Sequence, residues 1–497
     1  MPVATSLFRT KSVEQSVRET REPGHRLRRD LSALDLVVFG VGVIIGTGIF
    51  VLTGRVAREY AGPAVAISFA IAGLVCALAA LCYAEFASTV PVAGSAYTFS
   101  YATLGELPAW IIGWDLILEM ALGAAVVAVG WSGYFSSLLS TLGLDLPSTF
   151  AGEDARFNLP AVLIVALVTA VLVAGIKVSS RINGIMVLVK VAVVLLVIIA
   201  GAFSVKLANY TPFIPPAVPT EQVEGIRAPL LQLIFGITPV SFGWLGVFSA
   251  VAIVFFAFIG FDVVATTAEE AHRPQRDLPI GILGSLGVCT LLYVLVSLVV
   301  VGMQHYTDLS ESAPLADAFR AVGQPFFAGL ISIGAIFGLT TVVLILLLGQ
   351  SRVFFAMSRD RLLPGWLSEV HPRFGTPARS TIFMGVIVAL LAGFIPLSAL
   401  AELVNIGTLF AFVLVSAGVI VLRRTRPDLP RSFRAPLVPL LPILSILACI
   451  FVMLNLPAET WIRFVAWMLL GAVIYAFYGR RHSRLARSNE PNGRSVI

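Results

Sequence analysis

One apolar stretch decides how this chain folds, Asp35-Leu-Val-Val-Phe-Gly-Val-Gly-Val-Ile-Ile-Gly-Thr-Gly-Ile-Phe50. Four glycines fall within nine of its residues, although glycine is about 1 kcal/mol worse than alanine inside a helix. One interpretation is close helix packing through small residues, which is common in membranes. The tripeptide Gly46-Thr47-Gly48 favours a second interpretation, a helix that unwinds at its middle, because irregular backbone at bilayer depth is tolerated where it lines a cavity.

The composition makes the lipid bilayer the solvent for most of the chain. Of 497 residues, 58% are hydrophobic and only 12% are charged, about half the charged fraction of a soluble protein. The net charge of +6 does not indicate nucleic-acid binding, because the basic residues lie in short loops between apolar segments. The 4 cysteines lie in apolar stretches without metal-ligand spacing, and the 5 histidines lie in tails and loops. We therefore expect no metal, no cofactor and no enzymatic activity.

Apolar windows of about 20 residues, the length that spans a bilayer, predict an all-α membrane protein with 12 transmembrane helices. The tail before them is polar and basic and lacks the features of a signal peptide. The predicted cores are 35–59, 64–89, 107–139, 159–175, 183–204, 245–268, 279–303, 325–357, 379–397, 400–422, 436–454 and 458–478.

The distribution of lysine and arginine predicts the orientation of these helices. With both termini placed in the cytoplasm, 26 of the 34 basic residues fall on the inner side and 7 on the outer side, and Lys190 lies within a span. Such a bias follows the positive-inside rule. The compact loops and the absence of a targeting peptide indicate a bacterial inner (plasma) membrane.

A second interruption is predicted in the sixth span, Phe255-Phe-Ala-Phe-Ile-Gly-Phe-Asp262. A single glycine is a weak signal, but an acid inside an apolar span is costly and usually functional, which strengthens it. Interrupted helices at matching positions, the first and the sixth, are expected of two inverted five-helix repeats. The free N–H groups of a broken helix suit an anion and its free carbonyls suit a cation, so a zwitterionic amino acid needs both.

Several ordered motifs resemble those of the amino acid–polyamine–organocation superfamily. They are Ile45-Gly-Thr-Gly-Ile-Phe50, Tyr83-Ala-Glu-Phe86 with Pro91-Val-Ala-Gly-Ser-Ala-Tyr97, and Ile259-Gly-Phe-Asp262 with Ala268-Glu-Glu270 and Pro274-Gln-Arg-Asp-Leu-Pro279. Gly349-Gln-Ser-Arg352 and Met357-Ser-Arg-Asp360 resemble the cationic amino acid transporter branch. The resemblance covers roughly residues 30–480.

The resemblance implies a leucine-transporter-type fold, with 5+5 inverted repeats and two extra helices. The expected division is a cytoplasmic tail 1–34, a first repeat 35–204, an extracytoplasmic connection 205–244, a second repeat 245–422, helices 11 and 12 at 423–478 and a cytoplasmic tail 479–497. It also implies a substrate site between the first and sixth spans. There the substrate carboxylate meets N–H groups around Gly46, Thr47 and Gly48, and its ammonium meets carbonyls near Ile44, Phe256, Ala257 and Ile259.

Lys190 lies deep in the fifth span and is a candidate coupling residue. A snorkelling lysine would have to reach about 10 Å to the interface, at 1.5 Å per residue. A structural ion pair with Glu119 or Asp262 is another interpretation. Burial disfavours the charged form, so a lysine that gains and loses a proton is suited to coupling. In proton-coupled members of the superfamily, a lysine in this span stands where sodium-dependent relatives bind sodium, so the resemblance implies proton symport.

Three further acids lie within predicted spans. Asp115 and Glu119 are one turn apart and share a face of the third span. Glu119 matches an acid near the proton path of bacterial relatives, so it is a second candidate for proton coupling. Glu85 and Asp115 are as well explained by structural roles, such as bonding helix ends or inner-gate groups.

The resemblance implies that the eighth span is the wall for the substrate side chain, and here it contains threonines but no acid. By alignment, Leu346 falls where the size and polarity of the pocket are set. An apolar residue there favours a small neutral amino acid such as alanine over the arginine or lysine that the branch name suggests. A cationic amino acid transporter, an amino acid exchanger of the same fold and a membrane amino acid sensor remain alternatives.

Overall fold

The computed structural model describes residues 31–89, 95–144, 146–147, 149–151, 155–175, 180–219, 225–268 and 271–483. Most of the two predicted tails, residues 1–30 and 484–497, lies outside the described residues. So do residues 91–94 of the second motif and residues 269–270 of the third.

The first half of the described chain is almost entirely helical. Its elements are α3 (Ala33–Ile44), the π-helical η1 (Gly48–Leu52), α4 (Thr53–Val56), the π-helical η2 (Ala57–Ala61), the 3-10 turn η3 (Gly62–Ala64), α5 (Val65–Thr89), α6 (Ser95–Thr103), α7 (Glu106–Thr141), α8 (Leu159–Val173) and α9 (Ser180–Ala202). A connection follows, with η4 (Leu207–Tyr210), β1 (Val218–Pro219), η6 (Gly225–Arg227), α10 (Leu230–Phe235) and β2 (Val240–Ser241).

The second half repeats this helical character. Its elements are α11 (Gly243–Val254), the 3-10 segments η7 (Phe255–Phe258) and η8 (Asp262–Thr267), α12 (Pro274–Met303), η9 (Tyr306–Asp308), α13 (Pro314–Ala321), α14 (Pro325–Arg359), η10 (Gly365–Ser368), α15 (Ala378–Phe394), α16 (Leu397–Thr425), α17 (Leu440–Leu454), α18 (Ala458–Ile474), η11 (Tyr475–Gly479) and α19 (Arg480–His482).

Within the described ranges, 8 helical stretches are long and apolar enough to cross a membrane. Four shorter apolar helices, α3, α8, α15 and α17, accompany them. The chain is therefore a predominantly helical, multi-pass membrane protein. The count of 12 spans and the 5+5 arrangement stay predictions, because the four shorter helices do not reach a full span by length.

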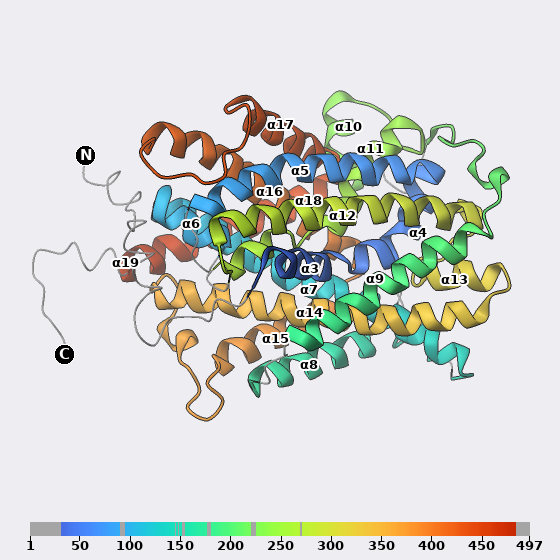
Figure 1. The fold of residues 1–497 in the computed structure, drawn as a ribbon, viewed down its shortest axis with the longest axis horizontal. Helices are drawn as coiled ribbons and strands as arrows, with labels where there is room; N and C mark the ends of the chain where they lie inside the picture. The colour runs from blue at the N-terminus through green and yellow to red at the C-terminus, as the bar shows by residue number, and fades with distance from the viewer. Residues whose placement is uncertain are drawn as a thin grey trace, which may run out of the picture.

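The long helices lie side by side along the longest axis of the molecule (Figure 1). Helix α12 packs against α3 and α5, and α7 packs against α14 and α16. Helices α6 and α19 lie at one end, and α4 and α13 at the other (Figure 1). The short, blue α3 lies near the middle of the view (Figure 1), and its last five residues, 40–44, are buried.

Local signals explain where several helices begin. The Ser32 side chain accepts a hydrogen bond from the backbone N–H of Asp35, and the Asp35 carboxylate accepts one from the N–H of Ser32, which is a capping box for α3. Asn158 caps α8 in the same way through the N–H of Ala161. Helix α12 begins at Pro274, earlier than the predicted 279, because proline suits the first helical position and Asp277 accepts from the N–H of Arg273.

The connection between α9 and α11 departs slightly from an all-α description. Its strands β1 and β2 form a two-stranded antiparallel sheet in which Val218 pairs with Ser241. Its apolar segment 230–237 contains the short helix α10, whose Ile234 and Phe235 are exposed. Each strand has only 2 residues, so the sheet does not change the helical character of the fold.

Candidate functional site

The first helix breaks where the glycine tripeptide predicted it. Helix α3 ends at Ile44, and Ile45 takes an extended conformation with φ −69° and ψ 98°. The carbonyl of Gly46 accepts from the N–H groups of Ile49 and Phe50, which starts the next helical segment. Within the described part of the chain, the N–H groups of Gly46, Thr47 and Gly48 make no backbone hydrogen bond. We call residues 45–48 the α3 break.

The sixth predicted span breaks as well. Helix α11 ends at Val254, a 3-10 turn follows, and Ile259 is extended before Gly260, which has φ +115°. This φ lies in a region that L side chains rarely adopt. A β-carbon on Gly260 would also lie 2.6 Å from a methyl group of Val43, so both conformation and space require glycine here. We call residues 255–261 the α11 break.

The two breaks meet backbone to backbone. A β-carbon on Gly48 would lie 2.9 Å from the backbone nitrogen of Ala257 and closer still to its α-carbon. Only glycine permits that approach. The glycine therefore does more than loosen the helix, because it brings the N–H end of one broken helix against the turn of the other.

Side chains from two other helices hold the open carbonyl ends of the breaks. The hydroxyl of Tyr293 on α12 donates to the carbonyl of Ile44 at 2.6 Å. The amide of Asn405 on α16 donates to the carbonyls of Ala252 at 2.8 Å and Ile253 at 3.2 Å. Sequence reasoning missed both residues, although a buried asparagine within an apolar span is a signal of such a role.

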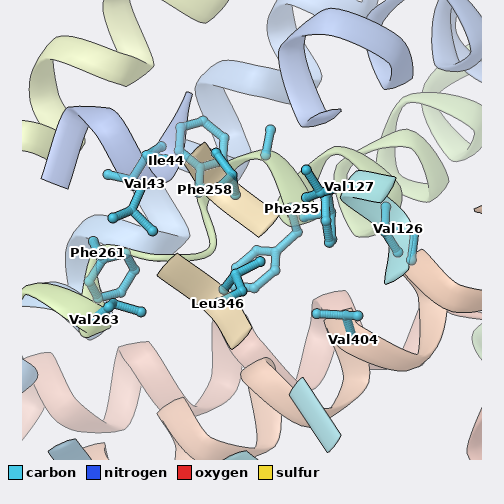
Figure 2. Packing of buried hydrophobic residues seen from close by; sticks show 14 of the residues in the cluster. Val43, Ile44, Val126, Val127, Phe255, Phe258, Phe261, Val263, Leu346 and Val404 are labelled. Carbon is cyan, nitrogen blue, oxygen red and sulfur yellow. The ribbon is translucent and has the colours of Figure 1, made fainter. Parts of the chain in front are cut away.

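A cavity of about 20 Å³ lies between the breaks. Seven of the predicted substrate residues line it, namely Ile44, Gly46, Thr47, Gly48, Phe256, Ile259 and Leu346. Ala257 lies behind them, against Gly48. Four residues that the sequence did not single out complete the lining: Val43, Gly123, Val127 and Val342. Figure 2 shows Val43, Ile44, Val127 and Leu346 grouped with Phe255 and Phe258 of the α11 break.

The lining of the cavity is apolar apart from one side chain. Thr47 is the polar side chain of its lining, and the Thr47 hydroxyl is buried without a hydrogen-bond partner in the described structure. Val127, Val342 and Leu346 supply an apolar wall of the same cavity. A space of this size holds about one water molecule, so an amino acid enters only if the walls move apart.

Lys190 reaches the α3 segment just before its break. Its side chain is fully buried on α9, and its Nζ donates to the carbonyl of Gly42 at 2.6 Å. No ion pair of Lys190 is present among the described residues, so the interpretation as a structural pair with Glu119 or Asp262 was wrong. The alkyl chain packs against Gly338 of α14, where a β-carbon would lie 3.0 Å from its Cγ.

Glu119 lies apart from the cavity lining, among other acids. It is 3% exposed, and Asp115 and Asp262 are close enough for their charges to act on it. The carboxylate oxygens of Asp115 and Asp262 are buried without hydrogen-bond partners in the described ranges. The shared helix face thus brings Asp115 and Glu119 together as predicted, and Asp262, directly after the α11 break, lies near them.

Glu85 has the structural role that was one of its two interpretations. Its carboxylate accepts from Arg423 Nε at 2.9 Å and from the other guanidinium branch at 2.7 Å. It also accepts from the N–H of Ala435 at 2.7 Å, and Arg431 lies 3.5 Å away. The buried acid therefore ties the end of α5 to α16 and to the segment that follows α16.

Comparison with known proteins decides the family, because the model described as "Amino acid permease" matches residues 31–477. This chain belongs to the amino acid permease family. Among the relatives of this permease, the branched-chain amino acid permease BcaP of Bacillus subtilis is 51% identical over 97% of this chain and 99% of its own length. The methylthioribose transporter of the same organism is 48% identical over the same shares. The vacuolar cationic amino acid transporter 4 of Arabidopsis thaliana is 42% identical over 85% of this chain and 68% of its own.

These relatives agree with the superfamily resemblance found in the sequence motifs. They are permeases and transporters, not enzymes, in agreement with the expectation from the sequence. The substrates in their names differ from one another, so family membership alone leaves the substrate of this permease to be argued from its own site.

Proposed function

We propose that this permease imports small neutral L-amino acids such as alanine by proton-coupled symport with alternating access. One observation carries the proposal: two broken helices face each other across a small cavity, and Gly48 touches Ala257 where they meet. Backbone at this depth is left without helical partners only where a ligand or another polar group satisfies it. Free N–H groups at one helix end suit the carboxylate of an amino acid, and the carbonyls at the other helix ends suit its ammonium group.

The substrate carboxylate binds, in this proposal, at the N–H groups of Gly46, Thr47 and Gly48. The positive end of the helix that begins there favours an anion, and the unpartnered Thr47 hydroxyl supplies one further donor. The substrate ammonium binds carbonyls at Ile44, Phe256, Ala257 and Ile259. The Ile44 carbonyl already accepts from Tyr293, but a carbonyl oxygen has a second lone pair.

The neutral substrate follows from the apolar wall that Val127, Val342 and Leu346 form. No acid lines the described cavity, so the cationic side chain of arginine or lysine would be desolvated there without a partner. The relative named a branched-chain amino acid permease fits such a wall. The relatives named cationic amino acid transporters keep the cationic substrate as the principal alternative.

Proton coupling is assigned to Lys190, with Glu119 as a second proton-binding residue. The ammonium of Lys190 bonds the carbonyl of Gly42, two residues before Ile44, so a change of its charge acts directly on the segment that ends at the α3 break. Loss of the proton removes a charge-assisted hydrogen bond from that segment. This gives protonation a mechanical route to the substrate site.

The architecture that goes with this function has 12 spans in 5+5 inverted repeats followed by two helices. We place both termini in the cytoplasm and the protein in the inner (plasma) membrane, with repeats at 35–204 and 245–422. The bias of basic residues and the breaks in the first and sixth predicted spans support this arrangement.

Uptake into proteoliposomes tests the proposal. Liposomes that contain the purified protein and are loaded with unlabelled alanine exchange it for labelled alanine from outside. In empty proteoliposomes, an inward proton gradient alone drives accumulation of alanine above equilibrium. Arginine accumulation without alanine accumulation overturns the neutral substrate. Counterflow without accumulation under a proton gradient identifies an exchanger, and binding without either identifies a sensor.

A further inference from the structure

The third and eighth predicted spans, α7 and α14, run antiparallel past the cavity. Four contacts between them show this, because the residue number rises on α7 as it falls on α14. They are Gly113 with Met357, Met120 with Gly349, Gly123 with Leu346, and Trp131 with Thr340. Gly123 therefore faces Leu346 at the level of the cavity, and both residues line it.

Gly123 differs from the other glycines of α7. A β-carbon on Gly113, Gly130 or Gly133 would meet neighbouring atoms at 2.8 Å, 2.7 Å and 2.7 Å, so these three glycines are needed for packing. A β-carbon on Gly123 would meet one atom within 4 Å, the Cδ1 of Leu346, at an ordinary 3.4 Å. The absence of a side chain at Gly123 is thus not explained by helix packing, and the space beside it opens into the cavity.

The surrounding wall is built to receive an apolar group. Val127 lies one helical turn beyond Gly123 on α7, and Val342 lies one turn before Leu346 on α14. Gly123 contacts Leu346, and the antiparallel register of α7 and α14 brings Val127 to the level of Val342. Thr47, within the α3 break, lines the same cavity. A substrate bound by its charged groups at the breaks would point its side chain at this wall.

We propose that Gly123 is a specificity-determining residue that acts with Leu346. The part of the cavity beside this pair, which we call the gap, receives the methyl branches of valine, leucine and isoleucine when the walls move apart, so the substrate class extends from alanine to branched aliphatic amino acids. This inference rests on the proposed function, because it assumes an amino acid bound at the breaks. Leu346 sets one wall of the gap, and Gly123 leaves the other wall open.

Substitutions that change the gap by one carbon test the inference. Gly123→Ala narrows it, and we expect the uptake ratio of valine to alanine to fall at least tenfold, the discrimination of about one methylene in an apolar pocket. Leu346→Val widens it and raises the ratio of leucine to alanine. The double variant Gly123→Ala with Leu346→Val recovers valine uptake, which a merely destabilised protein would not do.

A matched control is Gly329→Ala on α14, where no atom lies within 4 Å of the added β-carbon. It leaves all uptake ratios unchanged. Equal losses of valine and alanine uptake in Gly123→Ala, without recovery in the double variant, overturn the inference. Should Gly123→Ala fail to fold, Leu346→Val decides, since an unchanged leucine-to-alanine ratio contradicts the inference. A wild-type protein that transports alanine but no branched-chain amino acid overturns this inference alone, whereas transport of neither overturns the proposed function.

Discussion

Gly48 and Ala257 touch through their backbones, so that the two broken helices share one contact at the centre of the bundle. Each residue belongs to a segment that has left the regular helical path. The contact joins elements more than 200 residues apart in the sequence. It therefore fixes how the two breaks lie against each other, and substitution of Gly48 tests it.

Gly48→Ala forces the two breaks apart. The added β-carbon overlaps the backbone of Ala257, and overpacking of this kind costs about 1–3 kcal/mol. We expect alanine uptake to be lost and the melting temperature in detergent to fall by several degrees. Gly287→Ala on α12 is the matched control, because no atom lies within 4 Å of its added β-carbon. An unchanged alanine affinity in Gly48→Ala would contradict the assignment of the substrate site to the two breaks.

Tyr293→Phe removes the hydrogen bond that holds the end of α3. The Ile44 carbonyl then lies buried without its donor, at a cost of about 1–3 kcal/mol. We expect a lower melting temperature together with weaker alanine binding, measured by scintillation proximity. Tyr210→Phe serves as a comparison, because the Tyr210 hydroxyl also donates to a carbonyl, that of Leu298, but the side chain is half-buried. A smaller effect at Tyr293 than at Tyr210 would count against this assignment.

Lys190→Met separates substrate binding from coupling. It removes the ammonium that bonds the Gly42 carbonyl while keeping most of the buried alkyl volume. We expect counterflow of alanine to persist in part, whereas accumulation driven by a proton gradient disappears. Lys206→Met is the control, since Lys206 lies exposed on the connection after α9. Undiminished proton-driven accumulation in Lys190→Met would rule out Lys190 as the coupling residue.

Glu85→Gln weakens the tie between α5 and the segment after α16. The carboxylate is 2% exposed and bonds Arg423 through two branches, and breaking a buried pair of this kind costs about 3 kcal/mol. Glu369→Gln is a matched control, because its ion pair with Arg379 is exposed and is worth less than about 1 kcal/mol. Thermal unfolding in detergent compares the two variants. Equal melting temperatures of the two variants would show that the hydrogen bonds of Glu85 contribute no more to stability than an exposed ion pair.

Much of the local structure could be predicted from the sequence. Apolar length predicted the helices, and the glycines at 46, 48 and 260 predicted the two breaks, because backbone conformation depends on the residue itself and its immediate neighbours. The three acids Glu85, Asp115 and Glu119 were recognised as unusual within apolar spans. Their partners were not, since a partner is chosen by helices that meet only in three dimensions.

Lys190 shows most clearly where sequence reasoning ended. Its depth in α9 predicted a buried cation, but the sequence did not distinguish between Glu119 and Asp262 as possible partners. In the structure, Lys190 donates to the carbonyl of Gly42. This acceptor is a backbone group, so the residue types in the sequence do not single it out. Backbone acceptors are present at every residue, so only the packing of α9 against α3 selects one.

The sequence by itself determined that this protein is a helical membrane permease with breaks at Gly46–Thr47–Gly48 and near Gly260. Apolar runs and glycine act locally, so their consequences follow from the order of residues. The tertiary structure alone decided that Gly48 meets Ala257, that Tyr293 and Asn405 hold the broken ends, and that Gly123 faces Leu346. These contacts depend on the register between neighbouring helices. That register is set by the close packing of many side chains at once, so no single segment of sequence encodes it.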